Sequence, residues 1–526
     1  MKGALKVWLR NEAEIEAAIA QGEEVEVVES AYGANEFILD FLKDSGLWDI
    51  LTQMKPAMKK DNGYPSPVIL GTVVMKELLS IGKLAGMGKV ITDGKLMADL
   101  GFSLERIKAA KAAQKGLIDL GTIRNHLKRI PRAESANALY GHVGLLRAKR
   151  WIRGHQYVAD AVELEVPYGE DFEGMGRVWN PKRHCYLFGY KLELLMNVTS
   201  TGRLRFIGAA LGPINADERT LLEEIFGALE THLGQGKIKE IIGTLTLDRG
   251  YWGAGFLWKL THVWGVDFVT LVRDHGLEVA QAVEGYCAAL NPAFVPRSMR
   301  VSHRGRATRK KVWVCGINAL PLRRYGPEAR FKDWGEVNVV VLQDEDRHGR
   351  PRRRIYVTSL DAERDPFRIV KLYQDRWTIE NHGIRHLSQR WHLRDLAGRS
   401  LTSIQARIFS VLMLYNAVKI LEMKYEGRME ALHQRMQVRG QRSYLSGARL
   451  IIYGRRCYYG VFSGVRYAQA LAAAAAVTAA RRAAEETTEK VAIHTTRQIA
   501  TELERLLREP DSTTKIAEFI RKLKQD

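Results

Sequence analysis

Cysteine is scarce in this sequence, and the few that are present lie far apart. The 526 residues contain four cysteines, Cys185, Cys287, Cys315 and Cys457, and no two of them form a C-x-x-C pair. This spacing argues against a disulfide framework and against a structural zinc site. We therefore expect a soluble protein of a reducing cytoplasm.

Long apolar runs are also missing. No stretch approaches the roughly 18 apolar residues that a membrane-spanning helix needs, and the longest candidate, Leu471 to Ala480, is mostly alanine. The first residues are basic but reach Glu12 and Glu14 without the apolar core of a signal peptide. A G-x-x-x-x-G-K-[ST] loop is absent as well, so ATP binding is not indicated. We expect no membrane partner.

Charge is abundant, and one sign dominates. The chain has 80 Lys+Arg against 60 Asp+Glu, a formal net charge of +20. A surplus of this size favours a polyanionic partner, and nucleic acid is the first candidate. The length predicts about two to four domains.

The pattern divides the chain into five regions. Residues 1–150 carry apolar residues at helical spacing and are predicted to form a helical DNA-binding domain. Within it, Gly121 to Ile130 is expected to be a short helix with Thr122 as N-cap. A helix-turn-helix and a plain helical bundle are both compatible with this pattern. Residues 426–526 form a basic and helical C-terminal region, in which Val491 to Leu523 is a candidate dimerisation element.

Between these ends the pattern changes to strands. Residues 151–273 predict three strands, then a helix, a strand, a helix and a strand, at 155–164, 184–198, 204–211, 218–233, 240–247, 255–264 and 266–272. The first three strands suit an antiparallel meander and the later ones suit parallel β-α-β units. This order predicts an α/β protein with an RNase H-like mixed sheet, completed by residues 366–425.

A basic, β-rich insertion is predicted between the two parts of this core. It covers residues 274–365 and has short strand-like runs interrupted by Pro and Gly. Clustered arginines and lysines near Trp313 and Trp334 suit phosphate contact and base stacking. A solvated insertion with incidental charge is the alternative.

One helix after the insertion has an unusual polar face. If Lys371 to Ile384 is helical, Tyr373, Arg376 and Glu380 lie close together on one side. The simplest interpretation is an Arg376–Glu380 ion pair on a solvated surface, worth about 0.2–0.5 kcal/mol. The acids elsewhere in the chain favour a functional interpretation.

Three acids suit the same chemistry. Asp160 lies within the first core strand, Asp248 ends the fourth, and Glu380 lies on the helix after the insertion. Phosphodiester cleavage needs an activated attacking oxygen and a stabilised leaving oxygen, and two divalent ions held by carboxylates supply both. Mg²⁺ prefers oxygen ligands. We therefore predict Asp160, Asp248 and Glu380 as catalytic metal ligands.

These motifs resemble the DDE transposases of bacterial insertion sequences, in the cut-and-paste branch with the signature Tyr-x2-Arg-x3-Glu-x6-Lys. Tyr373, Arg376 and Glu380 match its first three positions. Asp248-Arg-Gly-Tyr251 resembles the branch's Asp-x-Gly-Tyr motif, and Asp160 its first-strand aspartate. The resemblance runs from about residue 155 to 420. The lysine position is occupied by Leu387, and Arg390 and Arg394 are candidate substitutes.

The resemblance implies a function and a set of partners. It implies two Mg²⁺ ions, with Mn²⁺ as a substitute, and contacts from Tyr373, Arg376 and Arg390 to DNA. It also implies cleavage at the terminal inverted repeats, a hairpin intermediate, joining to target DNA, and a synaptic homodimer on double-stranded DNA near the bacterial nucleoid. In the family the insertion holds a flipped base against a tryptophan, for which Trp313 and Trp334 are candidates.

Two other functions stay open. One is an RNase H-like nuclease with the same acids and no strand transfer. The other is a DNA-binding protein derived from a transposase that no longer cleaves; the three acids count against it, and Leu387 counts for it.

Overall fold

The structure is a computed structural model that falls into two compact units. Unit 1 comprises Met1–Gln53, Met58–His126 and Tyr425–Asp526, and unit 2 comprises Met54–Ala57 and Leu127–Lys424. The residues that the structure describes are 9–30, 35–57, 64–167, 169–199, 204–272, 278–303, 306–321, 336–345, 350–379, 383–424, 449–454, 458–462, 466–467, 469–476, 495–509 and 511–523.

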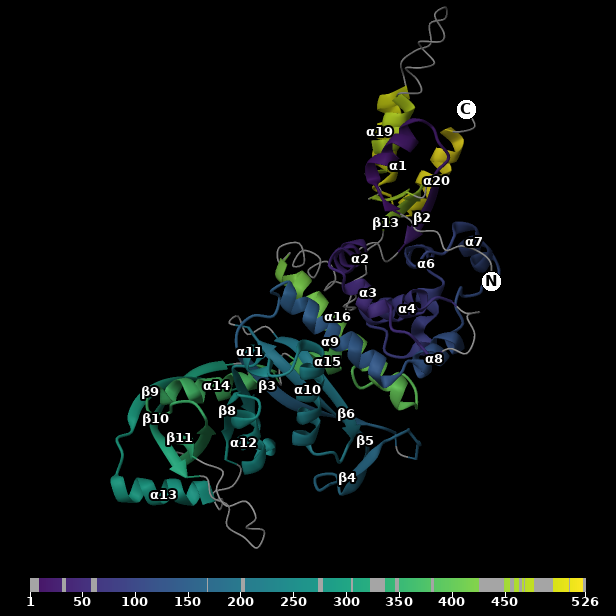
Figure 1. The fold of residues 1–526 in the computed structure, drawn as a ribbon. Coiled ribbons are helices and arrows are strands. Elements are labelled where there is room, and N and C mark those ends of the chain that lie inside the picture. Colours follow the sequence, from purple (N-terminus) through teal and green to yellow (C-terminus); the bar gives the residue numbers. More distant parts are fainter. Residues whose placement is uncertain are drawn as a thin grey trace, which may run out of the picture. The chain divides into compact units, whose positions relative to one another are not determined.

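Unit 2 is built on one large mixed sheet with helices against it (Figure 1). Its strands are β3 (Gln156–Glu165), β4 (Gly176–Asn180), β5 (Cys185–Val198), β6 (Leu204–Pro213), β7 (Thr244–Leu247), β8 (Asp267–Leu271), β9 (Val295–His303), β10 (Arg306–Pro321), β11 (Glu336–Glu345) and β12 (Pro351–Thr358). The order is β4-β5-β3-β7-β8-β12-β11-β10-β9, and β6 pairs with β5. Its helices are α9 (Arg132–Ala148), α10 (Glu218–Leu233), α11 (Ile238–Ile241), η2 (Arg249–Tyr251), α12 (Ala254–His262), α13 (Glu278–Leu290), α14 (Pro366–Ile379), α15 (Arg385–Arg390) and α16 (Leu401–Lys424).

The structure contains the predicted strands and helices of the core in the predicted order, with β4 added after β3 and α11 added before β7. β3, β5 and β6 form the antiparallel meander, while β3, β7 and β8 run parallel to one another. Asp217 caps α10, because its side chain accepts a hydrogen bond from the Arg219 amide at 2.8 Å. The strand expected over 240–247 is shorter than predicted, since Ile238–Ile241 forms a helical turn before β7 begins.

The insertion does not form a separate sheet. β12 pairs antiparallel with β8, and β11, β10 and β9 follow outward, so these strands lengthen the core sheet. Between β8 and β9 the chain forms α13, a helix that the sequence analysis did not identify. Val279, Ala280 and Val283 of α13 are buried against the sheet. Burial of this apolar face fixes the helix in a segment whose Pro and Gly content suggested strands and turns.

Helix α16 is the most deeply buried helix of unit 2. Asn416 anchors it to β6 by accepting from the Phe206 amide and donating to the Phe206 carbonyl, both at 2.8 Å. Among the described residues it is the one helix long and apolar enough to span a membrane by composition, and 94% of that window is buried within the protein. It begins at Leu401 and ends at Lys424.

Unit 1 combines segments from both ends of the chain. From the N-terminal side it has β1 (Leu9–Arg10), α1 (Glu12–Ala20), β2 (Glu26–Ser30), α2 (Asn35–Asp44), α3 (Leu47–Thr52), α4 (Ser66–Leu78), η1 (Leu84–Met87), α5 (Gly88–Ile91), α6 (Gly94–Asp99), α7 (Leu104–Ala112) and the start of α8 (Leu120–Arg129). From the C-terminal side it has β13 (Arg449–Tyr453), β14 (Tyr458–Phe462), α19 (Thr495–Leu506) and α20 (Ser512–Leu523).

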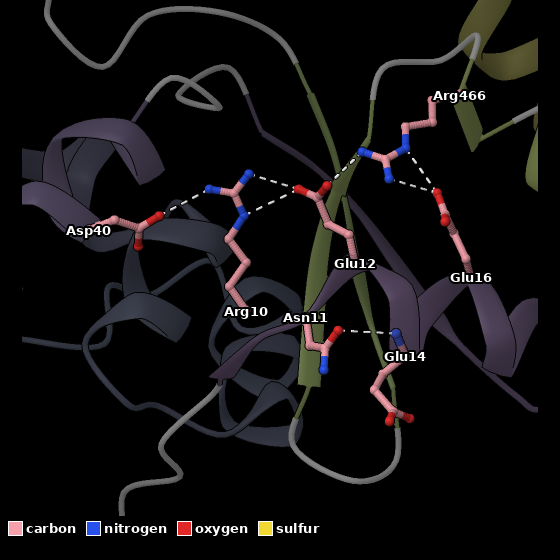
Figure 2. Close-up of polar contacts among 7 residues, drawn as sticks. All are labelled: Arg10, Asn11, Glu12, Glu14, Glu16, Asp40 and Arg466. Carbon is pink, nitrogen blue, oxygen red and sulfur yellow. Dashed lines mark hydrogen bonds and ion pairs between the residues drawn. The ribbon is translucent and has the colours of Figure 1, made fainter. Parts of the chain in front are cut away.

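The sheet of unit 1 interleaves the two ends. Its order is β1-β14-β13-β2, so the hairpin of β13 and β14 lies between the two N-terminal strands. The Arg466 guanidinium pairs with Glu12 and Glu16 of α1, and Arg10 pairs with Glu12 and Asp40 (Figure 2). The division therefore differs from the expected domains 1–150 and 426–526: these ends share one unit, and α9 belongs with the core.

Two local expectations in unit 1 need correction. The helix predicted over 121–130 is present as α8, but its cap is Asp119, whose Oδ1 accepts from the Gly121 and Thr122 amides at 2.7 and 3.2 Å. Arg449–Tyr453 and Tyr458–Phe462 are strands within the C-terminal region that we expected to be basic and helical. They pair with each other as a local hairpin, but their other partners, β1 and β2, lie more than 400 residues earlier, so no local pattern identifies those pairings.

Candidate active site

Asp160 and Asp248 lie side by side on neighbouring parallel strands. β3 and β7 pair with Ala159 opposite Leu247, so the next residue on each strand is an aspartate. The side chain of Asp160 is 17% exposed and that of Asp248 is 36% exposed. Both carboxylates therefore reach the surface at the carboxyl end of the parallel strands, which is the edge where open α/β sheets bind ligands.

One arginine bridges both carboxylates. Arg376 of α14 places Nη1 3.6 Å from Asp160 Oδ2 and Nη2 3.3 Å from Asp248 Oδ1. Its side chain is 8% exposed, so water screens this pairing less than it screens a surface ion pair. The guanidinium offsets the repulsion between two carboxylates that the sheet holds together.

Tyr373 binds one of the same carboxylates. It lies one turn before Arg376 on α14, and its hydroxyl donates a hydrogen bond to Asp248 Oδ1 at 3.2 Å. Burial and the negative charge of Asp248 raise the pKa of Tyr373 well above its usual value. The hydroxyl is therefore a hydrogen-bond donor at neutral pH, and it orients the Asp248 carboxylate.

Packing holds α14 in this position. Ile369, Val370 and Tyr373 of α14 belong to one buried cluster with Val269 of β8 and Tyr356 of β12. The Tyr356 and Tyr373 rings meet edge-on with centroids 5.3 Å apart. The strands of the insertion therefore form part of the apolar surface on which α14 packs. This gives the insertion a structural role beside any contact with DNA.

A buried pair supports the turn that follows β7. Tyr251 ends the short helix η2 after Asp248, and its hydroxyl donates to Glu193 Oε1 of β5 at 2.6 Å. Both side chains are completely buried. Burial raises the pKa of Glu193 well above its usual value, which favours the protonated carboxyl over the carboxylate. Sequence reasoning placed Tyr251 in a motif but gave no sign that Glu193 would be its partner.

The third predicted acid lies outside the described residues. α14 ends at Ile379, and the description resumes at residue 383 just before α15. Glu380 falls between them, as Trp334 falls in another such gap. Within the residues that are described, no group of three His, Cys, Asp or Glu side chains is placed to hold a metal ion. Asp160 and Asp248 supply two of the oxygen donors that Mg²⁺ prefers.

Leu387 occupies the position where the resembling family has a lysine. Leu387 lies on α15 with none of its surface exposed, so this position supports packing and presents no side chain to a ligand. Arg390 ends α15 and is partly exposed, whereas Arg394 follows the helix and is exposed. Trp313 lies on β10 with the Lys311 ammonium 5.3 Å from its ring centroid.

A mixed sheet with two carboxylates side by side on adjacent parallel strands is consistent with the RNase H-like domain of a DDE transposase. The comparison with protein families agrees: residues 156–417 match the family described as "Transposase DDE domain". The match begins in β3 and ends in α16, and it includes Asp160, Asp248, Tyr373 and Arg376. This segment of the chain is therefore similar to the transposase DDE domain. No curated protein matches the chain.

Proposed function

We propose that this protein is a Mg²⁺-dependent DNA transposase that cleaves the ends of an insertion sequence and joins them to target DNA. The observation that carries the proposal is the pairing of Asp160 and Asp248 with one shared arginine, on a segment that matches the transposase DDE domain. Glu380 is the proposed third ligand. A divalent ion bound by these carboxylates would activate the attacking oxygen and stabilise the leaving oxygen.

The charge at the site supports a requirement for cations. Two carboxylates and one guanidinium leave a net negative charge, which Glu380 would increase. A DNA phosphate is also negative and is repelled unless positive charge is added. Arg376 holds the two carboxylates together when no cation is bound, and Tyr373 fixes the orientation of Asp248. Both side chains are close enough to the carboxylates to contact a phosphate that binds there.

The proposed partners follow from the charge of the whole chain. A net charge of +20 suits double-stranded DNA as the substrate. We assign the terminal inverted repeats to unit 1 and the chemistry to unit 2, with two copies of the chain holding two ends. Two Mg²⁺ ions are expected, and Mn²⁺ should replace them.

A nuclease without strand transfer is the second candidate, because the same carboxylates would serve it. The test uses duplex DNA carrying the ends of the element, a target plasmid and Mg²⁺, with wild type, Glu380→Gln and the exposed-site control Glu163→Gln. We expect nicked ends and joined products with wild type and control only. Nicking without joining would assign the nuclease. Binding without nicking by wild type would show that the protein is not a nuclease or a transposase. Activity in Glu380→Gln would show that Glu380 is not a catalytic residue.

A further inference from the structure

The hairpin of β4 and β5 carries an exposed aromatic pair. Trp179 and Tyr186 lie directly opposite each other on the two strands and are each 50% exposed. Their rings meet edge-on with centroids 5.2 Å apart. Adjacent exposed aromatic side chains rimmed by polar residues form the kind of apolar patch that marks interaction sites. The sequence analysis did not identify β4, so this surface had no assigned role.

Cations surround the aromatic pair. The Arg177 guanidinium lies 5.4 Å from the centroid of the Tyr186 ring. Lys182 and Arg183 are exposed in the turn, which Asn180 holds by accepting from both of their amides at 3.0 and 3.1 Å. Arg183 pairs with Glu165, the last residue of β3. Aromatic rings beside cations can stack on bases while the cations bind phosphates.

The hairpin projects from the catalytic edge of the sheet. Glu165, the last residue of β3, pairs with Gly189, so Cys185 to Phe188 of β5 extend beyond the strand that bears Asp160. Asp160 pairs with Leu194 of β5, and Tyr186 lies eight residues before Leu194. Trp179 pairs with Tyr186, so the two aromatic side chains lie on the same face of the hairpin. Gly189, with a φ of 148°, lies between Tyr186 and Leu194 and interrupts the regular alternation of the strand.

The distance along β5 from the position beside Asp160 to Tyr186 is shorter than one turn of duplex DNA. Eight strand residues span roughly 26 Å at about 3.3 Å each. One turn of duplex DNA is about 34–36 Å long, so a duplex bound at Asp160 and Asp248 would still be alongside the sheet at the hairpin. Figure 1 shows β4 and β5 at the end of the sheet away from β9 and β10. The hairpin and the insertion thus lie on opposite sides of the two aspartates in the strand order.

We propose that the β4–β5 hairpin is a second DNA-binding element, which stacks Trp179 and Tyr186 on unpaired bases and holds the neighbouring phosphates with Arg177 and Lys182. The segment it binds is the DNA that leaves the catalytic carboxylates on the side opposite the insertion. This inference rests on the proposed function, because it takes DNA as the substrate.

The test measures DNA affinity of the full chain without Mg²⁺. Two fluorescent probes of the same sequence are used, a blunt duplex and a duplex with a single-stranded fork, each with wild type, Trp179→Ala/Tyr186→Ala, and Trp258→Ala. Trp258 is the matched control, since it is an exposed tryptophan of α12 on the same unit. Equal thermal midpoints establish that each variant folds.

We expect the double variant to bind the forked probe about tenfold more weakly per base no longer stacked, with a smaller loss on the blunt duplex and none for Trp258→Ala. Arg177→Gln and Lys182→Gln should each reduce the slope of log affinity against log salt by roughly 0.7–0.9. Unchanged affinity of all variants for both probes would overturn the inference. A double variant that keeps its affinity but changes the mass of the protein in sedimentation would also overturn it, by showing a contact between protein copies. Failure of wild type to bind either probe would contradict the proposed function itself.

Discussion

Each of the two units has its own sheet, and the two sheets take their strands from the chain in different ways. In unit 2 the core strands pair mostly with strands near them in sequence, and the insertion extends the same sheet. In unit 1 the central strands β13 and β14 come from the far end of the chain and separate β1 from β2. Unit 2 can therefore fold as it is synthesised, whereas unit 1 has to wait for the last part of the chain.

Removing the C-terminal strands should have the largest effect on unit 1. Ending the chain at residue 448 deletes β13 and β14, so β1 and β2 lose their partners and unit 1 should unfold. Unit 2 keeps every strand of its sheet. We expect hydrogen exchange to show loss of protection in residues 9–112 and retained protection in residues 156–272.

A shorter deletion is the control for that truncation. Removing Ser512–Leu523 takes away α20, which packs on α19 through Ile516 and Phe519, and leaves the sheet intact. Residues 9–30 should stay protected. If the longer deletion also leaves unit 1 protected, the interleaved sheet is not what stabilises it.

A second test addresses unit 2 through Glu193. Because burial raises its pKa in the folded protein, the folded state keeps a proton that the unfolded state releases above about pH 4.5. The contribution of this group to stability is thus complete below that pH and decreases as the pH rises toward the folded pKa. Glu193→Gln keeps the oxygen that accepts from Tyr251 and removes the titration.

We therefore expect Glu193→Gln to gain thermal stability relative to wild type at pH 8 but not at pH 4. The gain should be confined to the unfolding transition of unit 2. Glu163→Gln, at an exposed position of the same sheet, should show no such trend. A difference between Glu193→Gln and wild type that is the same at both pH values would refute the buried proton.

The smallest effect is expected at the ion pairs of unit 1. Arg466 pairs with Glu12 and Glu16, and its side chain is 44% exposed (Figure 2). Solvent screening limits such pairs, so Arg466→Ala should cost less than about 1 kcal/mol of unfolding free energy in unit 1. Arg505→Ala, whose partners Glu502 and Glu509 are local, should cost no more. A loss of several kcal/mol at Arg466 would mean that this contact, rather than the sheet, joins the two ends.

The sequence predicted unit 2 better than unit 1 for a physical reason. Apolar periodicity and turn residues are local, so the strands with Asp160 and Asp248, and the helix with Tyr373 and Arg376, were located closely. The pairing of β1 with β14 depends on residues at opposite ends of the chain. Contacts between strands, such as Tyr251 with Glu193, depend on register and burial that no single segment encodes.

The site shows the same limit on a smaller scale. The motifs predicted that Asp160, Asp248, Tyr373, Arg376 and Glu380 lie together. The structure brings the first four together, and Glu380 lies outside the described residues. The motifs did not show that Arg376 would contact both aspartates, or that Leu387 would be fully buried. β4 was missed because it has only five residues, and α13 because it lies in a segment whose Pro and Gly content suggested strands and turns.

If Asp160 and Asp248 bind the metal ions for DNA cleavage, as we propose, Asp248→Asn should stop cleavage by removing one ligand. The measurement is the rate at which a duplex carrying the element's ends is nicked in Mg²⁺, with Asp171→Asn as an exposed control. Losing a residue that merely orients a metal ligand costs roughly 10–100-fold in activity, so loss of the ligand should cost more than about 100-fold. Nicking by Asp248→Asn at the rate of wild type would show that Asp248 is not required for cleavage.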